Sequence, residues 1–498
     1  MTRFISPEDT SGERKKGRKK KSSPPPNLLF FSDYESGNLQ SVKPLNDGIE
    51  YEISLRPDTL ADQYRNWFYF SVFGSKPNQR VVFSIVNFSK QRSLYRDRMT
   101  PLVRSRSKPH LGWSRLPPRN CFYYKSSRHG GSYLLSFIFT FEADGDEIFD
   151  FAYSFPYTYT DLQKYLDSLQ RQSLPYFDLS LLCRTNQMRR VDLVEIREET
   201  KYLQKKKALF KNYVRPVVAI TGRVHPGETP ASFVVQGFLN FCTSKAEEAV
   251  YLRKVVDIFV VPMLNPDGVF VGNYRTDSTG VDLNRRWDAP NKEMEPSLYY
   301  TKELLKKIDG EKGRRLDMFI DVHSHSTCKR SFMFCNPPKS MESMNSEEDL
   351  KDMSTMNSLK KVLVFLEFLE IYMLEFSLQT CRWDIDSHKV GSARRALEKI
   401  LPETLCYTFE ASFFHDIQGI SQESGSFANR RPGQPAQAEI NTEKSYIGMG
   451  EQLGKAMSHY YKSLEMNLFQ TSTKTKSFAP VKTELKNNPI QGLERLKI

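Results

Sequence analysis

The stretch VRPVVAITGRVHPGETPASFVVQGFLNF, residues 214–241, contains a β-forming run, a turn and a helical run in direct succession. Val214 to Ile220 is a short apolar run rich in β-branched residues, which is typical of a buried strand. Ala231 to Ser244 has a helical pattern, and the Pro-Gly pair at 226–227 between the two runs favours a turn. This order predicts one strand–helix unit of an α/β sheet.

The same alternation continues along residues 166–465. Further strand-like runs are Val255 to Leu264, Leu316 to Val322 and Leu405 to Phe409, and further helical runs are Pro296 to Ile308 and Ser358 to Leu378. We therefore expect a doubly wound, mixed α/β sheet with helices on both faces. Functional groups in such sheets gather at the carboxyl ends of the strands.

Residues 48–165 have a different texture, with short β-forming runs separated by Gly- and Pro-containing turns. This pattern predicts a small, all-β, sandwich-like domain ahead of the α/β domain. Its runs are Tyr51 to Leu55, Trp67 to Phe73, Arg80 to Asn87, Phe122 to Tyr124 and Tyr133 to Phe141.

Both ends of the sequence are polar, and we expect them to be disordered. Residues 1–47 form a Pro-rich, basic arm, and residues 466–498 form a Lys-rich tail. The run RKKGRKKK (14–21) fits a solvated block of like charge, but nuclear targeting or docking to an acidic surface remain alternatives.

The composition limits the class of protein and its setting. The 498 residues are 39% apolar, which excludes a disordered chain as a whole, and the net charge of +13 fits an acidic substrate or partner without showing one. Seven cysteines without a CxxC pair, and no apolar N-terminal stretch, favour a reducing, cytosolic setting with thiols as small core residues. The apolar run Val362 to Leu378 contains three glutamates, so it predicts an amphipathic or buried helix rather than a membrane span.

Three of the eight histidines lie beside predicted strand ends. His225 and Glu228 leave the first strand three residues apart, and His323 ends a later strand. Catalytic zinc takes His nitrogen and Glu oxygen from three protein ligands and keeps one position open. His225 and Glu228 alone would also fit a chance turn. His325 is expected to line the site or cap a turn rather than to bind metal.

Two arginines and an acidic residue complete the candidates for chemistry. Arg275 and Arg285 lie on loop-like sequence; one, with Asn284, can hold a C-terminal carboxylate, and the other can stabilise an oxyanion. Surface pairing with nearby aspartates is the alternative. Glu410 lies inside the apolar run CYTFEASFF (406–414). It is either a structural carboxylate paired with a cation or a base that moves a proton from the attacking water to the leaving amine.

Six motifs occur here in the order found in the M14 zinc carboxypeptidases: HPGE, NPDGV, GNYR, DLNRRW, DVHSHS and YTFEASF. Upstream, LRPDT (55–59), WFYFSV (67–72) and FPYTYTDLQKYL (155–166) resemble the cytosolic carboxypeptidase (Nna1-like) subfamily. The resemblance covers roughly residues 48–465, and six ordered motifs are far more specific than any one of them.

The resemblance implies a role for each matching residue. The implied zinc ligands are His225, Glu228 and His323, and the implied general base is Glu410. Arg275 is implied to stabilise the oxyanion, and Asn284 and Arg285 to bind the substrate carboxylate. Asp282 is implied to contact the first histidine ligand and fix its orientation. Arg394, with Arg395 as runner-up, matches the position thought to face the side chain being removed. A basic residue there favours glutamate.

The implied protein is a zinc metallocarboxypeptidase that removes C-terminal or branch glutamates from acidic tails such as polyglutamylated tubulin. The expected setting is cytoplasmic, associated with microtubules or cilia, with a nuclear fraction from the basic arm. We expect a monomer without a specific nucleic-acid partner. The alternatives are a zinc acylase of the aspartoacylase type, against which the β domain and YTFEASF speak, and a non-catalytic binding module on the same fold. The tyrosine that digestive members use near the substrate carboxylate is not located, and residues 336–380 match no subfamily motif.

Overall fold

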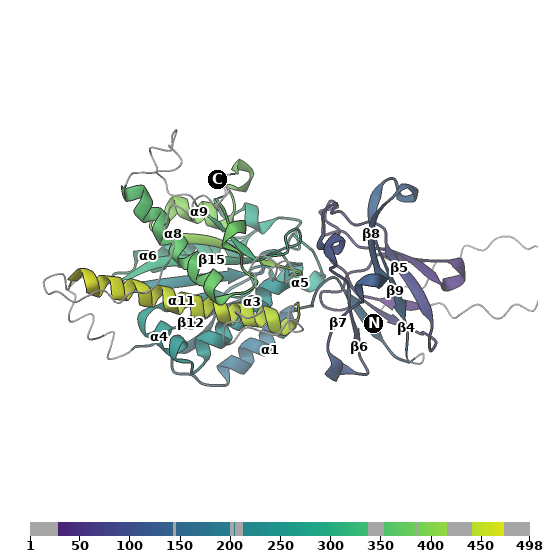
Figure 1. Cartoon of the computed structure of the whole chain (residues 1–498), viewed down its shortest axis with the longest axis horizontal. Coiled ribbons are helices and arrows are strands. Elements are labelled where there is room, and N and C mark those ends of the chain that lie inside the picture. Colours follow the sequence, from purple (N-terminus) through teal and green to yellow (C-terminus); the bar gives the residue numbers. More distant parts are fainter. Residues whose placement is uncertain are drawn as a thin grey trace, which may run out of the picture. The chain divides into compact units, whose positions relative to one another are not determined.

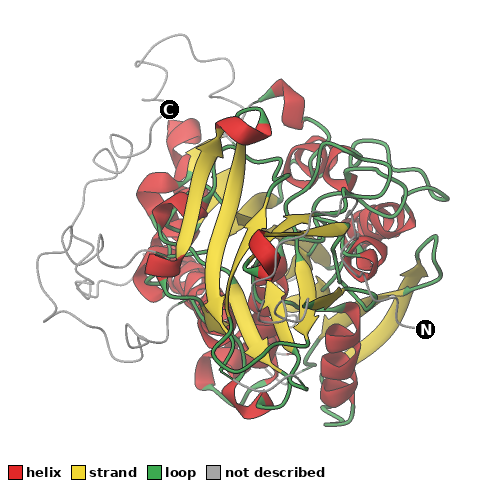
Figure 2. Cartoon of the chain, turned by 90° about the vertical axis from the view of Figure 1, so that its right-hand side faces the viewer, coloured by secondary structure: helices red, strands yellow, loops and turns green. Residues whose placement is uncertain are grey.

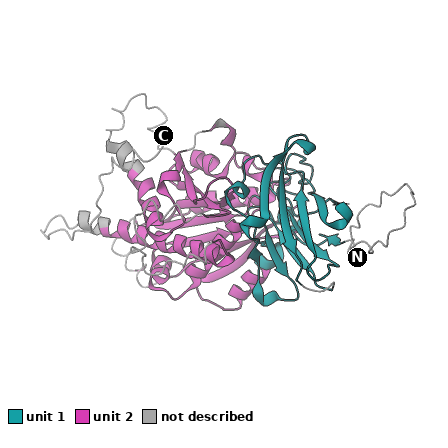
Figure 3. Cartoon of the chain, turned by 45° about the vertical axis from the view of Figure 1, so that its right-hand side comes forward, with its two compact units in different colours: residues 1–162, 225–229, 265–282 teal, residues 163–224, 230–264, 283–498 magenta. Residues whose placement is uncertain are grey.

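The computed structural model describes residues 28–142, 146–199, 204, 213–336, 353–383, 386–415 and 441–472. The chain divides into two compact units (Figure 3). Unit 1 comprises residues 1–162 together with the short segments 225–229 and 265–282. Unit 2 comprises residues 163–224, 230–264 and 283–498.

Two five-stranded sheets form the framework of unit 1. One has the order β1-β4-β10-β6-β7, and the other has the order β2-β3-β5-β9-β8. The strands are β1 (Leu29–Phe31), β2 (Ser41–Leu45), β3 (Glu50–Ser54), β4 (Tyr69–Phe73), β5 (Arg80–Ile85), β6 (Leu102–Ser105), β7 (Ser114–Arg115), β8 (Cys121–Ser126), β9 (Ser132–Thr140) and β10 (Phe149–Ala152).

Aromatic side chains from both sheets fill the core of unit 1. Phe83 of β5 has its ring centroid 5.3 Å from that of Phe151 of β10, and Phe30 of β1 lies 5.2 Å from Tyr51 of β3. Each of these pairs joins one sheet to the other, and the edge-to-face and tilted arrangements are the favoured ones for aromatic rings. The predicted sandwich-like β domain is therefore confirmed.

The prediction of disorder throughout residues 1–47 is wrong for the part that the structure describes. Strands β1 and β2 lie in that range, and Leu28 and Phe30 are fully buried. The apolar side chains of a three-residue strand gain their burial from partner strands distant in sequence, so the local pattern did not identify them. The basic run 14–21 and residues 473–498 lie outside the described residues.

Unit 2 is built on an eight-stranded mixed sheet of order β11-β12-β14-β13-β15-β18-β16-β17. The central strands β14, β13, β15 and β18 are parallel to one another, whereas β12 and β16 pair antiparallel with β14 and β18. The strands are β11 (Phe177–Arg184), β12 (Arg190–Ile196), β13 (Arg215–Gly222), β14 (Asp257–Val261), β15 (Arg314–His325), β16 (Phe332–Cys335), β17 (Arg382–Trp383) and β18 (Leu405–Ser412). The predicted α/β class is confirmed.

Helices and strands alternate along unit 2, and Figure 2 draws the helices in red and the strands in yellow. Helices α6 and α9 pack against β15, and α11 runs along α8 and α4 (Figure 1). The main helices are α1 (Tyr159–Gln170), α3 (Thr229–Thr243), α4 (Glu247–Val255), α5 (Pro266–Val271), α6 (Pro296–Gly310), α8 (Met353–Tyr372), α9 (Ala393–Ile400) and α11 (Glu443–Ser472).

Several element boundaries differ from those predicted. The predicted division at residues 165/166 falls inside α1, and α11 continues to Ser472, beyond the predicted start of the tail at 466. The antiparallel strands β11 and β12, at one end of the sheet, were not predicted. In the part of the chain that the structure describes, no helix combines the length and apolar character needed to cross a membrane. All seven cysteines are free thiols, and five of them are buried.

Candidate active site

The parallel strands β13, β15 and β18 are neighbours in unit 2, so their carboxyl ends lie at one edge of the sheet. Gly222, the last residue of β13, pairs with Val322 of β15, and His323 pairs with Glu410 of β18. Residues paired in this way point to the same face of a sheet. His225 follows β13 by three residues. The topology therefore gathers the predicted ligands and the predicted base at this edge.

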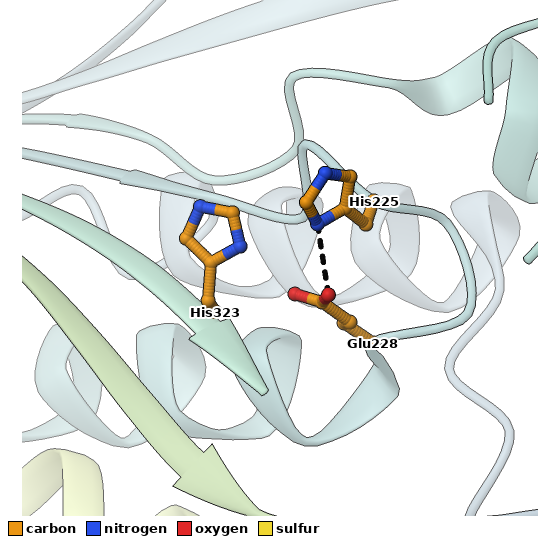
Figure 4. Close-up of side chains that lie close together, drawn as sticks. All are labelled: His225, Glu228 and His323. Carbon is orange, nitrogen blue, oxygen red and sulfur yellow. Dashed lines mark hydrogen bonds and ion pairs between the residues drawn. The ribbon is translucent and has the colours of Figure 1, made fainter. Parts of the chain in front are cut away.

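His225, Glu228 and His323 form a cluster that can hold a metal ion (Figure 4). One ligand atom from each lies within 4.8 Å of the other two. The three residues are only 4%, 8% and 2% exposed, respectively. Two imidazoles and one carboxylate are the ligand set of a catalytic zinc site.

Carboxylates hold both histidines in an orientation suited to a metal. The Nδ1 atom of His225 faces Glu228 Oε1 at 2.8 Å, and its Nε2 atom lies 3.2 Å from Asp282 Oδ1. His323 directs Nε2 to Asp321 Oδ2 at 2.8 Å, so Nδ1 is its nitrogen for an ion. Metal-binding histidines commonly donate their second N–H to a carboxylate, which fixes the ring and the tautomer. These residues therefore fit a zinc ion.

Asp321 is a site residue to which the sequence analysis assigned no role. It is fully buried on β15, and its Oδ1 accepts a hydrogen bond of 2.7 Å from Thr221 Oγ1. The sequence signal was its spacing, because Asp321 and His323 are two residues apart on one strand and share a face.

Arg275 and Asp282 are joined in unit 1. Arg275 Nε donates to Asp282 Oδ2 at 2.8 Å, and a second guanidinium nitrogen lies at the same distance. Burial lowers the pKa of Arg275, but Asp282 and Glu228 outweigh this effect and raise that pKa. The same Asp282 carboxylate thus links a guanidinium and His225.

Asn284 and Arg285 lie on a short turn of unit 2 near His323. The Asn284 Nδ2 atom is 3.3 Å from His323 Nε2, and its Oδ1 accepts a hydrogen bond of 3.0 Å from the backbone N–H of Ala393. Arg285 is half-buried and donates to the carbonyl oxygen of Asn284. The segment that starts α9 is therefore tied to the turn that carries Asn284.

The two candidate selector arginines differ in burial and contacts. Arg394 is 2% exposed and donates to the carbonyl oxygen of Cys335 and to Asn336 Oδ1. The Nη1 atom of Arg395 lies 3.9 Å from Oε2 of Glu398, which is on the same helix. Two neutral oxygens thus orient the Arg394 guanidinium.

His325 lies beyond the ligand cluster on β15. Its Nδ1 accepts from the backbone N–H of Cys328, and its Nε2 is 3.1 Å from the carbonyl oxygen of Arg330. It therefore caps a turn, as expected. Glu410 is half-buried in the strand beside His323.

Comparisons with known proteins agree with this geometry. The profile described as zinc carboxypeptidase matches residues 162–328, and that of the cytosolic carboxypeptidase N-terminal domain matches residues 30–144. Cytosolic carboxypeptidase 6 of Mus musculus is 38% identical over 460 residues, which cover 92% of this chain and 76% of the mouse protein. Cytosolic carboxypeptidase 6 of Caenorhabditis elegans is 39% identical over 390 residues, with coverages of 78% and 79%. The chain belongs to the cytosolic carboxypeptidases.

A cytosolic carboxypeptidase is a zinc-family metallocarboxypeptidase, so the chain is a hydrolase that acts as an exopeptidase. The fold agrees with solved structures. The metallo-carboxypeptidase from Burkholderia cenocepacia superimposes with a TM-score of 0.67 at 19% identity, covering 88% of this chain and all of that one. At this level of identity the likeness concerns the fold alone.

Proposed function

We propose that this cytosolic carboxypeptidase removes glutamate from the C-termini or branches of acidic protein tails, such as polyglutamylated tubulin. The observation that carries the proposal is the buried Arg394 guanidinium. Its neighbour Ala393 is hydrogen-bonded to Asn284, the residue proposed to bind the substrate's terminal carboxylate. A buried cation tied to that subsite favours a terminal residue with a second carboxylate.

In this proposal His225, Glu228 and His323 hold zinc. When bound, zinc would supply a Lewis acid that polarises the scissile carbonyl and makes water more acidic. Asp282 and Asp321 keep the two histidines in the ligating tautomer through their Nε2 atoms. The buried position of all three ligands limits competing water.

Glu410 acts as the general base. It takes a proton from the attacking water and then delivers it to the leaving amine. Its place opposite His323 in the β15–β18 register supports this role, and the residue is only half-buried. Arg275 stabilises the negative charge that develops on the carbonyl oxygen, because its charge is preserved by Asp282 and Glu228.

Asn284 and Arg285 bind the free carboxylate of the substrate, which makes cleavage exopeptidic. Arg394 then selects the side chain of the residue being removed, and Arg395, engaged near Glu398, is the weaker candidate. The net charge of +13 favours acidic tails as substrates. We extend the proposal to a monomer acting in the cytoplasm on microtubule or ciliary tubulin.

The test is to incubate the protein with linear and branched glutamylated tubulin-tail peptides, and with matched peptides ending in leucine, and to identify the released residue by mass. We expect release of glutamate and little release of leucine. Arg394→Gln removes a charged partner worth about 1.5–3 kcal/mol, so kcat/KM for glutamate should fall roughly 10- to 100-fold. Arg395→Gln is the matched control and should retain activity.

The outcomes separate the substrate from the enzyme class. No glutamate released from any peptide would reject the proposed substrate. Preferred release of leucine, unchanged by Arg394→Gln, would reject Arg394 as the selector. Loss of glutamate selectivity in Arg395→Gln, with selectivity kept in Arg394→Gln, would assign side-chain selection to Arg395.

A further inference from the structure

The loop that carries Arg275 depends on a residue of the N-terminal β domain. Residues 272–282 follow α5 and belong to unit 1 with the β domain, although they are connected in sequence to elements of unit 2. Residues 272–282 form neither helix nor strand. With no strand ladder to hold it, the loop depends on single backbone hydrogen bonds and on side-chain contacts for its conformation.

Asp58, in the LRPDT motif, supplies the densest of these contacts. Its Oδ1 accepts from the backbone N–H of Tyr274 at 2.6 Å, and its Oδ2 accepts from the N–H groups of Arg275 and Thr276 at 2.7 and 2.9 Å. The Thr276 hydroxyl adds a contact of 3.2 Å. Asp58 is 2% exposed. One buried carboxylate thus satisfies three consecutive backbone donors, centred on Arg275.

The peptide of Tyr274 continues this connection to the metal-binding turn. Its carbonyl oxygen accepts a hydrogen bond of 2.7 Å from Gly227 N, between His225 and Glu228. A Cβ atom on Gly227 would lie 2.5 Å from the Tyr274 ring and 2.9 Å from the Tyr274 carbonyl oxygen, so only glycine fits where the two segments approach each other.

Neighbouring residues brace the same loop. Asn273 Oδ1 accepts from the backbone N–H of Thr59 at 3.1 Å, and Asn273 Nδ2 donates to the carbonyl oxygens of Thr276 and Asp277. Asn38 Nδ2 donates to the carbonyl oxygen of Gly272 at 3.1 Å. These bonds hold the flanks of the loop, whereas Asp58 holds the peptide groups on both sides of the Arg275 Cα.

We infer that Asp58 is a positioning residue for catalysis: the β domain uses its carboxylate to place the Arg275 side chain and to support the His225–Glu228 turn. The inference rests on the proposed role of Arg275. It implies that the β domain is a working part of the active site and that removing it removes activity, not only stability. Asp58 itself touches neither substrate nor metal in this scheme.

Asp58→Asn is the informative variant, because it keeps the shape and one acceptor but directs an NH₂ group at backbone donors. Misplacement of a catalytic group by about 1 Å can cost roughly 100-fold in rate. We expect kcat on a glutamylated peptide to fall about 10- to 100-fold while KM stays within about threefold. Asp62→Asn is the matched control, since Asp62 is an exposed carboxylate four residues away.

A double-mutant cycle distinguishes positioning from general destabilisation. If Asp58 acts through Arg275, Asp58→Asn should lower kcat further by no more than about twofold in an Arg275→Ala background. Zinc content and the melting temperature are measured for each protein. Additive losses in proteins that keep their full zinc content, or a kcat of Asp58→Asn within twofold of wild type, would overturn the inference.

A second variant keeps the inference testable if Asp58→Asn does not fold. Asp58→Glu retains the carboxylate but displaces it by one methylene, and we expect at least a fivefold fall in kcat with full zinc content. Unchanged kcat in Asp58→Glu would reject the positioning role. The inference and the proposed function fail differently: an active Arg275→Ala protein rejects the proposed role of Arg275, whereas an inactive one beside a fully active Asp58→Asn protein rejects only the role of Asp58.

Discussion

Asp282 and Asp321 contact the Nε2 atoms of the two histidine ligands. Replacing each of them by asparagine should weaken zinc binding, but to very different extents. Asp321 lies between His323 Nε2 and the Thr221 hydroxyl, whereas Asp282 lies between His225 Nε2 and the Arg275 guanidinium. A hydroxyl can donate or accept, but a guanidinium only donates. The partner on the far side therefore decides whether an amide fits.

In Asp321→Asn the amide oxygen can stay on His323 Nε2, because the NH₂ group can then donate to the Thr221 oxygen. The imidazole keeps its tautomer, and only the charge of the acceptor is lost. A hydrogen bond to a charged group is worth about 1 kcal/mol more than a neutral one, so the zinc dissociation constant should rise roughly fivefold.

In Asp282→Asn neither orientation of the amide works. With the oxygen on His225, the NH₂ group faces the donors of Arg275; with the amide turned, His225 Nε2 must accept and the proton moves to Nδ1, the atom that faces Glu228. A misdirected polar group adds about 1–2 kcal/mol to the charge loss, the lower end of the usual range because the Asp282 side chain is 14% exposed. The total of about 2–3 kcal/mol corresponds to a roughly 30- to 150-fold rise in the dissociation constant.

The assay is chelator competition on metal-free protein at one fixed pH, with the melting temperature of the metal-free form as the control for folding. Thr221→Val in the Asp321→Asn background removes the hydroxyl acceptor, so the loss should then grow toward that of Asp282→Asn. Equal losses in the two single variants, or a larger loss in Asp321→Asn, would refute the reasoning from partner chemistry.

Three further predictions concern catalysis, pH and packing. Glu410→Gln should keep its zinc but lose about 10²- to 10⁴-fold in kcat, and a variant that releases amino acids at the normal rate would remove Glu410 as the base. Burial raises the pKa of Glu375 from 4.5 to about 7. The stability that this residue contributes through its protonated form is therefore complete below pH 4.5 and is lost as the pH rises through 7. Chemical denaturation should therefore show that, between pH 5 and pH 8, the free energy of unfolding falls by about 2 kcal/mol more in the wild type than in Glu375→Gln. The same pH dependence of the free energy of unfolding in both proteins would contradict this. A Cβ on Gly450 of α11 would lie 1.9 Å from the carbonyl oxygen of Val234 on α3, so Gly450→Ala should destabilise by about 1–3 kcal/mol, whereas Gly448→Ala, with open space at its Cβ, should stabilise by up to about 1 kcal/mol.

The strands and helices of the core were predictable because their signals are local. The apolar run that became β13 and the helical run that became α3 appear in the sequence within a residue or two of their observed bounds. Periodicity reports which side chains need burial, and this need exists before any partner is known. Strand β1 has only three residues and pairs with β4, a segment distant in sequence. Strands β11 and β12 pair with each other as a hairpin, and the sequence analysis did not predict them.

The composition of the metal site was also set by the sequence, through motif order. His225, Glu228 and His323 were predicted together, and the structure brings their ligand atoms within 4.8 Å. The roles of Arg275, Asn284, Arg285, Arg394 and Glu410 stay predictions, and the structure supplies contacts that the experiments above can break one at a time.

The sequence by itself determined the elements and the kinds of residue available for chemistry, because local backbone preference and side-chain chemistry are properties of short segments. Only the tertiary structure decided which residue holds each of these chemical groups in position. Asp58 meets Arg275 across 217 positions of the chain, and Thr221 meets Asp321 across 100. Contacts of that separation depend on strand register and loop closure, which no local pattern specifies.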